Sequence, residues 1–76
     1  MKEVYTMKIL LKAFVMQVKR SNGEILDPYL CSLLEAAIDR EDLIGGIEDV
    51  LRTVEQFPSF FISDFALKLL VKLKAE

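Results

Sequence analysis

Three short breaks divide the chain of 76 residues into four segments, each long enough to form a helix. The first break, Ser21 to Glu24, contains an Asn-Gly pair that readily takes the left-handed conformation at a helix end. The second, Asp39 to Gly46, is rich in acidic residues and glycine. The third contains Pro58, which forces the preceding residue out of helical geometry. We therefore predict one all-α domain over residues 1–76, a small four-helix bundle with helices at residues 3–20, 28–39, 42–56 and 60–75.

The two middle segments repeat their apolar residues at the spacing of one helix face. Asp27 is a suitable cap for a helix that has Pro28 in its first turn. The apolar positions of this second segment are Leu30, Leu33, Leu34, Ala37 and Ile38. In the third segment they are Ile44, Ile47, Leu51 and Val54. Gly45 and Gly46 are poor helix residues, so they either lie at a frayed helix start or let another helix approach closely.

The first segment admits a second interpretation, because residues 14–26 also fit a β-hairpin around an Asn-Gly turn. However, its apolar residues do not alternate, and Lys8, Lys12 and Lys19 fall on one side of a helical wheel. We therefore favour a helix followed by a turn. For the fourth segment a helix is also predicted, with Ser59 as its cap.

The two outer segments contain more apolar residues than one buried face requires. A helix with one buried face needs about three apolar positions in seven, whereas about two thirds of residues 4–20 and 60–75 are apolar. Helices that are apolar nearly all round are buried on more than one side, and a four-helix domain has no central place for two of them. We predict that the chain forms a homodimer or binds another protein through Val4, Leu11, Val18, Phe60, Leu67 and Val71.

Charge is divided along the chain in three blocks. Residues 1–20 contain five basic and one acidic residue, residues 21–64 contain two and ten, and residues 65–76 contain three and one. The basic outer helices and the acidic middle can therefore attract each other, either within one chain or between two copies docked antiparallel. Such a pattern also helps to select a partner.

Residues suited to catalysis are scarce. The chain has no histidine, the usual general base near neutral pH. Cys31 falls beside the apolar face of the second helix, so we interpret it as a core residue with an inert thiol. The sequence has no Cys/His set for zinc, and residues 21–27 lack the ligand spacing of a calcium loop. We predict a non-enzymatic, regulatory interaction module without a cofactor or metal.

Nucleic-acid binding is the alternative function. If the outer helices lie side by side, one basic strip able to contact phosphates would form from Lys8, Lys12, Lys19, Lys68 and Lys72. The sequence pI of about 5.1 argues against this footprint. The apolar runs are too short to span a bilayer, and Lys12 interrupts the run that would otherwise suit a signal peptide. We therefore expect a soluble cytoplasmic protein.

Overall fold

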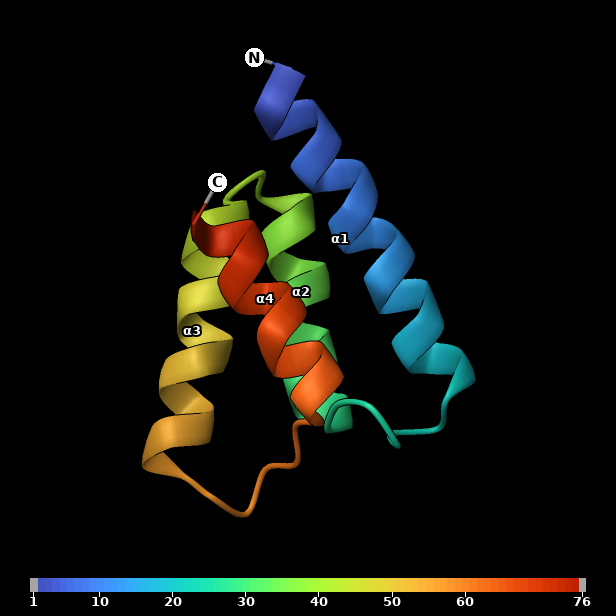
Figure 1. The fold of residues 1–76 in the computed structure, drawn as a ribbon, viewed down its shortest axis with the longest axis vertical. Coiled ribbons are helices and arrows are strands. Elements are labelled where there is room, and N and C mark those ends of the chain that lie inside the picture. The colour runs from blue at the N-terminus through green and yellow to red at the C-terminus, as the bar shows by residue number, and fades with distance from the viewer. Residues whose placement is uncertain (1, 76) are drawn as a thin grey trace.

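The computed structural model describes the backbone of residues 2–75 and the side chains of residues 6–75. Over this range it contains four helices, which confirms the predicted all-α fold. They are α1 (Lys2–Arg20), α2 (Pro28–Asp39), α3 (Leu43–Gln56) and α4 (Asp64–Ala75). In the view of Figure 1, α4 crosses in front of α2, with α3 on one side and α1 on the other. The main packing contacts join α2 to both α1 and α3, and α3 to α4.

The ends of α1, α2 and α3 follow local signals in the sequence. Asn22 and Gly23 both have positive φ angles, 54° and 85°, and they turn the chain after α1. Because residues 14–20 are helical, the hairpin alternative is excluded. Helix α2 begins with the Asp27 carboxylate accepting a hydrogen bond from the Tyr29 amide, at 2.8 Å. Helix α3 begins in the same way, with Asp42 accepting from the Gly45 amide at 3.2 Å.

Helix α4 begins four residues later than the sequence predicts, at Asp64 instead of residue 60. The preceding segment is held extended against the loop between α1 and α2, where Leu26 and Ile62 form an antiparallel bridge. The Asp27 amide donates to the Phe61 carbonyl and the Ser63 amide to the Ile25 carbonyl, both at 2.9 Å. Ser63 then caps α4, its Oγ accepting from the Ala66 amide at 3.1 Å.

This placement of the cap predicts different effects at two serines. Ser63→Ala is expected to lower the free energy of unfolding by about 1 kcal/mol, the usual cost of a lost helix cap. Ser59→Ala should change it by less than about 0.5 kcal/mol, since Ser59 is exposed and lies outside the helix. Urea unfolding followed by far-UV circular dichroism measures both. A larger cost at Ser59 than at Ser63 would contradict the observed start of α4.

The core lies around α2 and receives side chains from every helix. Gly46 of α3 packs directly on Ala37 of α2, so that a Cβ added at Gly46 would overlap the Ala37 Cβ. Gly46 therefore permits a close helix approach, whereas Gly45 lies at the start of α3 against the Asp42 cap. Cys31 is 5% exposed and belongs to the core, as predicted. The core cluster consists of Met7, Leu11, Phe14, Val15, Val18, Leu26, Leu30, Cys31, Leu34, Ile38, Leu43, Ile47, Val50, Ala66, Leu70 and Leu73.

Candidate protein-interaction surface

Large apolar side chains are exposed on every helix and in the linker between α3 and α4. Their exposed fractions run from 38% to 56%. The chain is nevertheless compact, because its radius of gyration is 11.3 Å and about 11 Å is typical of a folded domain of this length. The exposure therefore does not come from a loose fold. The side chains are Ile9, Leu10, Met16, Tyr29, Ile44, Phe57, Phe61, Phe65, Leu67 and Val71.

Three of these apolar side chains lie on the neighbouring helices α3 and α4, Ile44 on the first and Leu67 and Val71 on the second. An ion pair joins the two helices there, with 3.7 Å between Lys74 Nζ and Glu48 Oε2. On α4, Val71 and Leu67 lie one and two turns before Lys74, respectively, on the same side of the helix. On α3, Ile44 lies one turn before Glu48. We call this surface the α3–α4 face and define it as Ile44, Glu48, Leu51, Glu55, Leu67, Val71 and Lys74.

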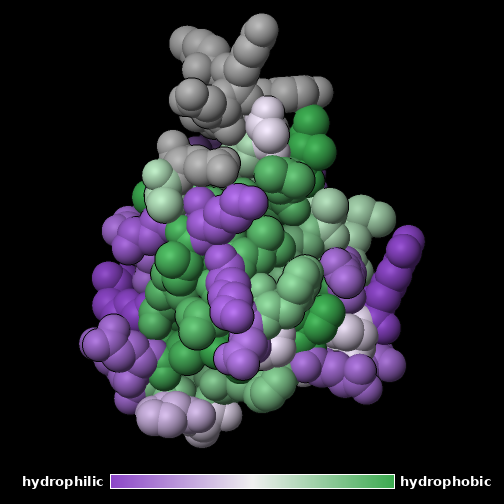
Figure 2. Space-filling model, viewed as in Figure 1, coloured by the Kyte–Doolittle hydropathy of each residue, from purple (hydrophilic) through white to green (hydrophobic). Residues whose placement is uncertain are grey.

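The α3–α4 face has an acidic edge and a basic edge. Glu48 and Glu55 are exposed on the α3 side of the apolar residues. On α4, the helical spacing of 100° per residue places Lys68 and Lys72 beyond Leu67 and Val71, on the side away from α3. Figure 2 shows hydrophobic surface on either side of a hydrophilic strip that runs over α4, with more hydrophilic surface at the outer edge over α3.

A second apolar surface is formed by the aromatic residues of the α3–α4 linker. Phe60 stacks on Tyr29 with 5.2 Å between ring centroids, and Phe57 meets Phe60 edge-on at 6.3 Å. These contacts cover Phe60 in part and leave Phe57 more than half exposed. The group fastens the linker to the start of α2, so part of its apolar surface already has a structural role.

The structure divides the predicted interface residues into three groups. Leu67 and Val71 are exposed, 38% and 49%, on the same side of α4. Phe60 is partly buried in the aromatic group. Leu11 and Val18 are 0% and 2% exposed. Their placement on the outer surface was wrong, since both belong to the core. The side chain of Val4 lies outside the described residues.

The lysines of α1 explain this error, because they follow the seam between α1 and α2. Lys8 Nζ lies 3.4 Å from Glu41 Oε1, and Lys19 Nζ lies 2.7 Å from Glu35 Oε2. A lysine can lay its aliphatic stem along a packed seam while its ammonium group reaches water or a carboxylate. The buried side of α1 is therefore next to the lysines. Its outward apolar residues are Ile9, Leu10 and Met16.

The five lysines of the predicted basic strip occupy two separate places, and Lys8 belongs with Lys12 and Lys19 at the α1–α2 seam. Lys12 and Lys19 line a shallow cleft between α1 and α2, where the hydrogen bond and negative charge of Glu35 raise the pKa of Lys19. Lys68 and Lys72 lie on the side of α4 opposite the buried Ala66 and Leu70. Since α4 packs mainly on α3 and α1 mainly on α2, the two groups do not join into one strip.

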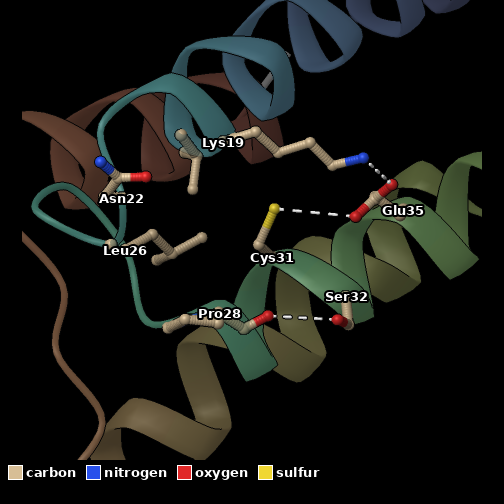
Figure 3. Close-up of a pocket in the computed structure, with 9 residues that line it drawn as sticks. Lys19, Asn22, Leu26, Pro28, Cys31, Ser32 and Glu35 are labelled. Carbon is tan, nitrogen blue, oxygen red and sulfur yellow. Dashed lines mark hydrogen bonds and ion pairs between the residues drawn. The ribbon is translucent and has the colours of Figure 1, made fainter.

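A cleft of about 410 Å³ opens between the end of α1 and the start of α2 (Figure 3). Cys31 Sγ lies at its wall, 3.9 Å from Glu35 Oε1, while Lys19 binds the other oxygen of the same carboxylate. Burial, followed by the negative charge of Glu35, raises the pKa of the Cys31 thiol. Activated cysteine nucleophiles have the opposite shift. This cleft therefore gives no support to cysteine catalysis.

The described residues contain no group of three or more side chains placed to hold a metal ion. Nor is any helix in the described part of the chain both long and apolar enough to cross a bilayer. Comparison with protein-family models, curated proteins and solved structures found no match. The function of this chain is therefore inferred from the chemistry of its exposed surface, above all from the α3–α4 face.

Proposed function

We propose that this chain is a small, non-enzymatic interaction module with a regulatory role, which acts as a homodimer or as a subunit of a protein complex. The observation that carries the proposal is the α3–α4 face, where Leu67 and Val71 are exposed together on one side of α4 and Ile44 is exposed on the adjoining α3. Contiguous apolar patches with a polar rim are typical of protein-binding sites. The free cysteine is buried, so the module does not depend on an oxidising compartment.

The strength of such a contact can be estimated from the same three side chains. Each is already half covered, so complete burial gains roughly half of the 1.5–3 kcal/mol for a fully exposed residue. Two copies together gain on the order of 4–9 kcal/mol before the entropy of association is subtracted. Association costs at least about 4 kcal/mol, which leaves about 5 kcal/mol at most, so we expect a weak dimer with a Kd of about 0.2 mM or higher, which suits a reversible, regulated contact.

A double substitution on α4 tests the proposal. Leu67→Glu combined with Val71→Lys is expected to give folded monomers, because it places charges in the middle of the apolar surface and leaves the core untouched. Sedimentation equilibrium from micromolar to about millimolar concentrations measures the mass, and circular dichroism checks the fold. The matched control is Ile9→Glu with Met16→Lys on the outward side of α1, where exposure is similar. The control should keep the mass of the wild-type chain.

An unchanged dimer mass in the α4 variant, or loss of the dimer in the α1 control, would contradict the assignment of the α3–α4 face. The alternative function, nucleic-acid binding, has less support because Lys8 and Lys19 are already paired with carboxylates. Titration with labelled DNA and RNA at low salt separates the two functions, since phosphate contacts weaken steeply as salt rises.

A further inference from the structure

We infer that the partner of the α3–α4 face is a second copy of the same face, related by a two-fold axis that runs along the helices. Each α4 would then lie antiparallel on α3 of the other copy. This inference rests on the self-association proposed above and adds the arrangement of the two chains. Three properties of the face carry it, namely its charged edges, the symmetry of a contact between identical surfaces, and the heights of the charged residues along the helices.

The two edges of the face are of opposite charge. On the α3 side the exposed carboxylates of Glu48 and Glu55 outnumber Arg52, which is paired with Asp49, and on the α4 side Lys68 and Lys72 outnumber Asp64. The apolar residues lie between them. Glu48 is only weakly engaged by Lys74, at 3.7 Å, and both side chains stay nearly half exposed. A complementary partner therefore has its basic edge opposite the α3 carboxylates and its acidic edge opposite the α4 lysines.

Symmetry decides how a second copy can meet this requirement. In a closed dimer of identical faces, the two-fold axis lies in the plane of contact. An axis across the helices places carboxylates opposite carboxylates and lysines opposite lysines, which is destabilising. An axis along the helices exchanges the two edges, so each acidic edge meets a basic edge. The charge pattern thus selects the axis that runs along the helices.

The direction of the helices agrees with this choice. Helices α3 and α4 run in opposite directions within one chain (Figure 1). A rotation about an axis along the helices keeps the direction of each one, so α4 of one copy lies antiparallel to α3 of the other. All neighbours in the resulting group of four helices are then antiparallel, as in an up-and-down bundle. Antiparallel neighbours also place opposite ends of the helix dipoles side by side.

The charged residues are at matching heights. The Glu48–Lys74 contact shows which parts of α3 and α4 lie at a similar height within one chain. Lys68 is six residues before Lys74 and Glu55 is seven after Glu48. With a rise of about 1.5 Å per residue, their heights agree within about 2 Å. Lys72 and Glu48 agree within about 3 Å. Since the rotation preserves height, the expected ion pairs between copies are Lys68 with Glu55 and Lys72 with Glu48.

Two charge-reversed chains test the arrangement. One carries Lys68→Glu and Lys72→Glu, which makes both edges acidic. The other carries Glu48→Lys and Glu55→Lys, which makes both edges basic. Each variant alone is expected to dimerise at least tenfold more weakly than the wild-type chain, because equal charges then face each other. An equimolar mixture should form a heterodimer at least as strong as the wild-type dimer. Sedimentation equilibrium at low salt measures all four samples, and circular dichroism confirms that each chain is folded.

A third chain with all four substitutions controls for effects on folding. Its edges are exchanged but again complementary, so it is expected to dimerise within about threefold of the wild-type strength. Variants that each dimerise like the wild-type chain, or a mixture that stays monomeric, would overturn this arrangement while leaving self-association in place. A wild-type chain that stays monomeric at every concentration would overturn the proposed function itself, and this inference with it.

Discussion

Replacing Leu11 with alanine is expected to lower the free energy of unfolding by about 2–5 kcal/mol, the usual cost of truncating a buried leucine. The same replacement at the adjacent Leu10 should cost less than about 0.5 kcal/mol. Leu11 is 0% exposed in the core, whereas Leu10 is 44% exposed. Domains of this size are stable by roughly 4–11 kcal/mol in total, so the Leu11 variant should lose a large share of its stability.

The two substitutions form a matched pair, because they change the same side chain at neighbouring positions of one helix. Urea unfolding of both variants, followed by far-UV circular dichroism at one protein concentration, gives the two free energies. Equal losses would show that α1 faces the core through a different side from the one observed. A greater loss at Leu10 would show that the outward surface of α1, with Ile9 and Met16, is the one that a partner covers.

This pair also shows why the orientation of α1 was difficult to predict. The sequence has apolar residues on both sides of the lysines, and a helical wheel does not distinguish which side is buried. The choice depends on which apolar side packs against α2, with Glu35 and Glu41 receiving Lys19 and Lys8 along that seam. These contacts join positions far apart in the chain, so local periodicity contains no information about them.

For the end of α1 and the start of α2, sequence signals within one helical turn were sufficient to predict the position. Asp27 and Pro28 start α2, and the Asn-Gly pair ends α1. The start of α4 was wrong because Ser59 and Ser63 are both suitable caps, and the choice between them depends on the distant bridge between Leu26 and Ile62. Long-range pairing thus overrides a local preference that is otherwise satisfactory.

The α3–α4 face was predicted only in part, again because long-range packing decides which apolar residues are buried. Leu67 and Val71 were assigned to the surface, since the surplus apolar residues of α4 cannot all face one core, and both are exposed. Ile44 was assigned to the buried stripe of α3 but is 38% exposed. Leu43, Ile47 and Val50 also follow helical spacing and are the residues that are buried. Two overlapping apolar stripes were present in the sequence, and only the packing of α3 on α2 selects one.

Replacing Gly46 with alanine is expected to lower the free energy of unfolding by about 1–3 kcal/mol, the range for overpacking a close contact. In an open helix the same change would add about 1 kcal/mol of stability, because alanine is the better helix former. Here the new Cβ overlaps the Ala37 Cβ, which is fixed to the backbone of α2 and has no rotamer to escape into. Helices α2 and α3 must therefore separate, and the core around Leu34 and Ile47 loosens.

Ala37→Gly supplies the test of this cause. Combined with Gly46→Ala, it moves the methyl group from α2 to α3 and restores the close approach, so the double variant should recover most of the loss. Urea unfolding of the wild-type chain, the two single variants and the double variant gives the coupling energy between the two positions. A double variant that loses less stability than the sum of the two single losses supports the contact. If Gly46→Ala stabilises the protein, or if Ala37→Gly adds its full cost to that of Gly46→Ala, the two helices do not meet at this pair. The packing that exposes the α3–α4 face would then be wrong as well, because α4 is held in place mainly through α3.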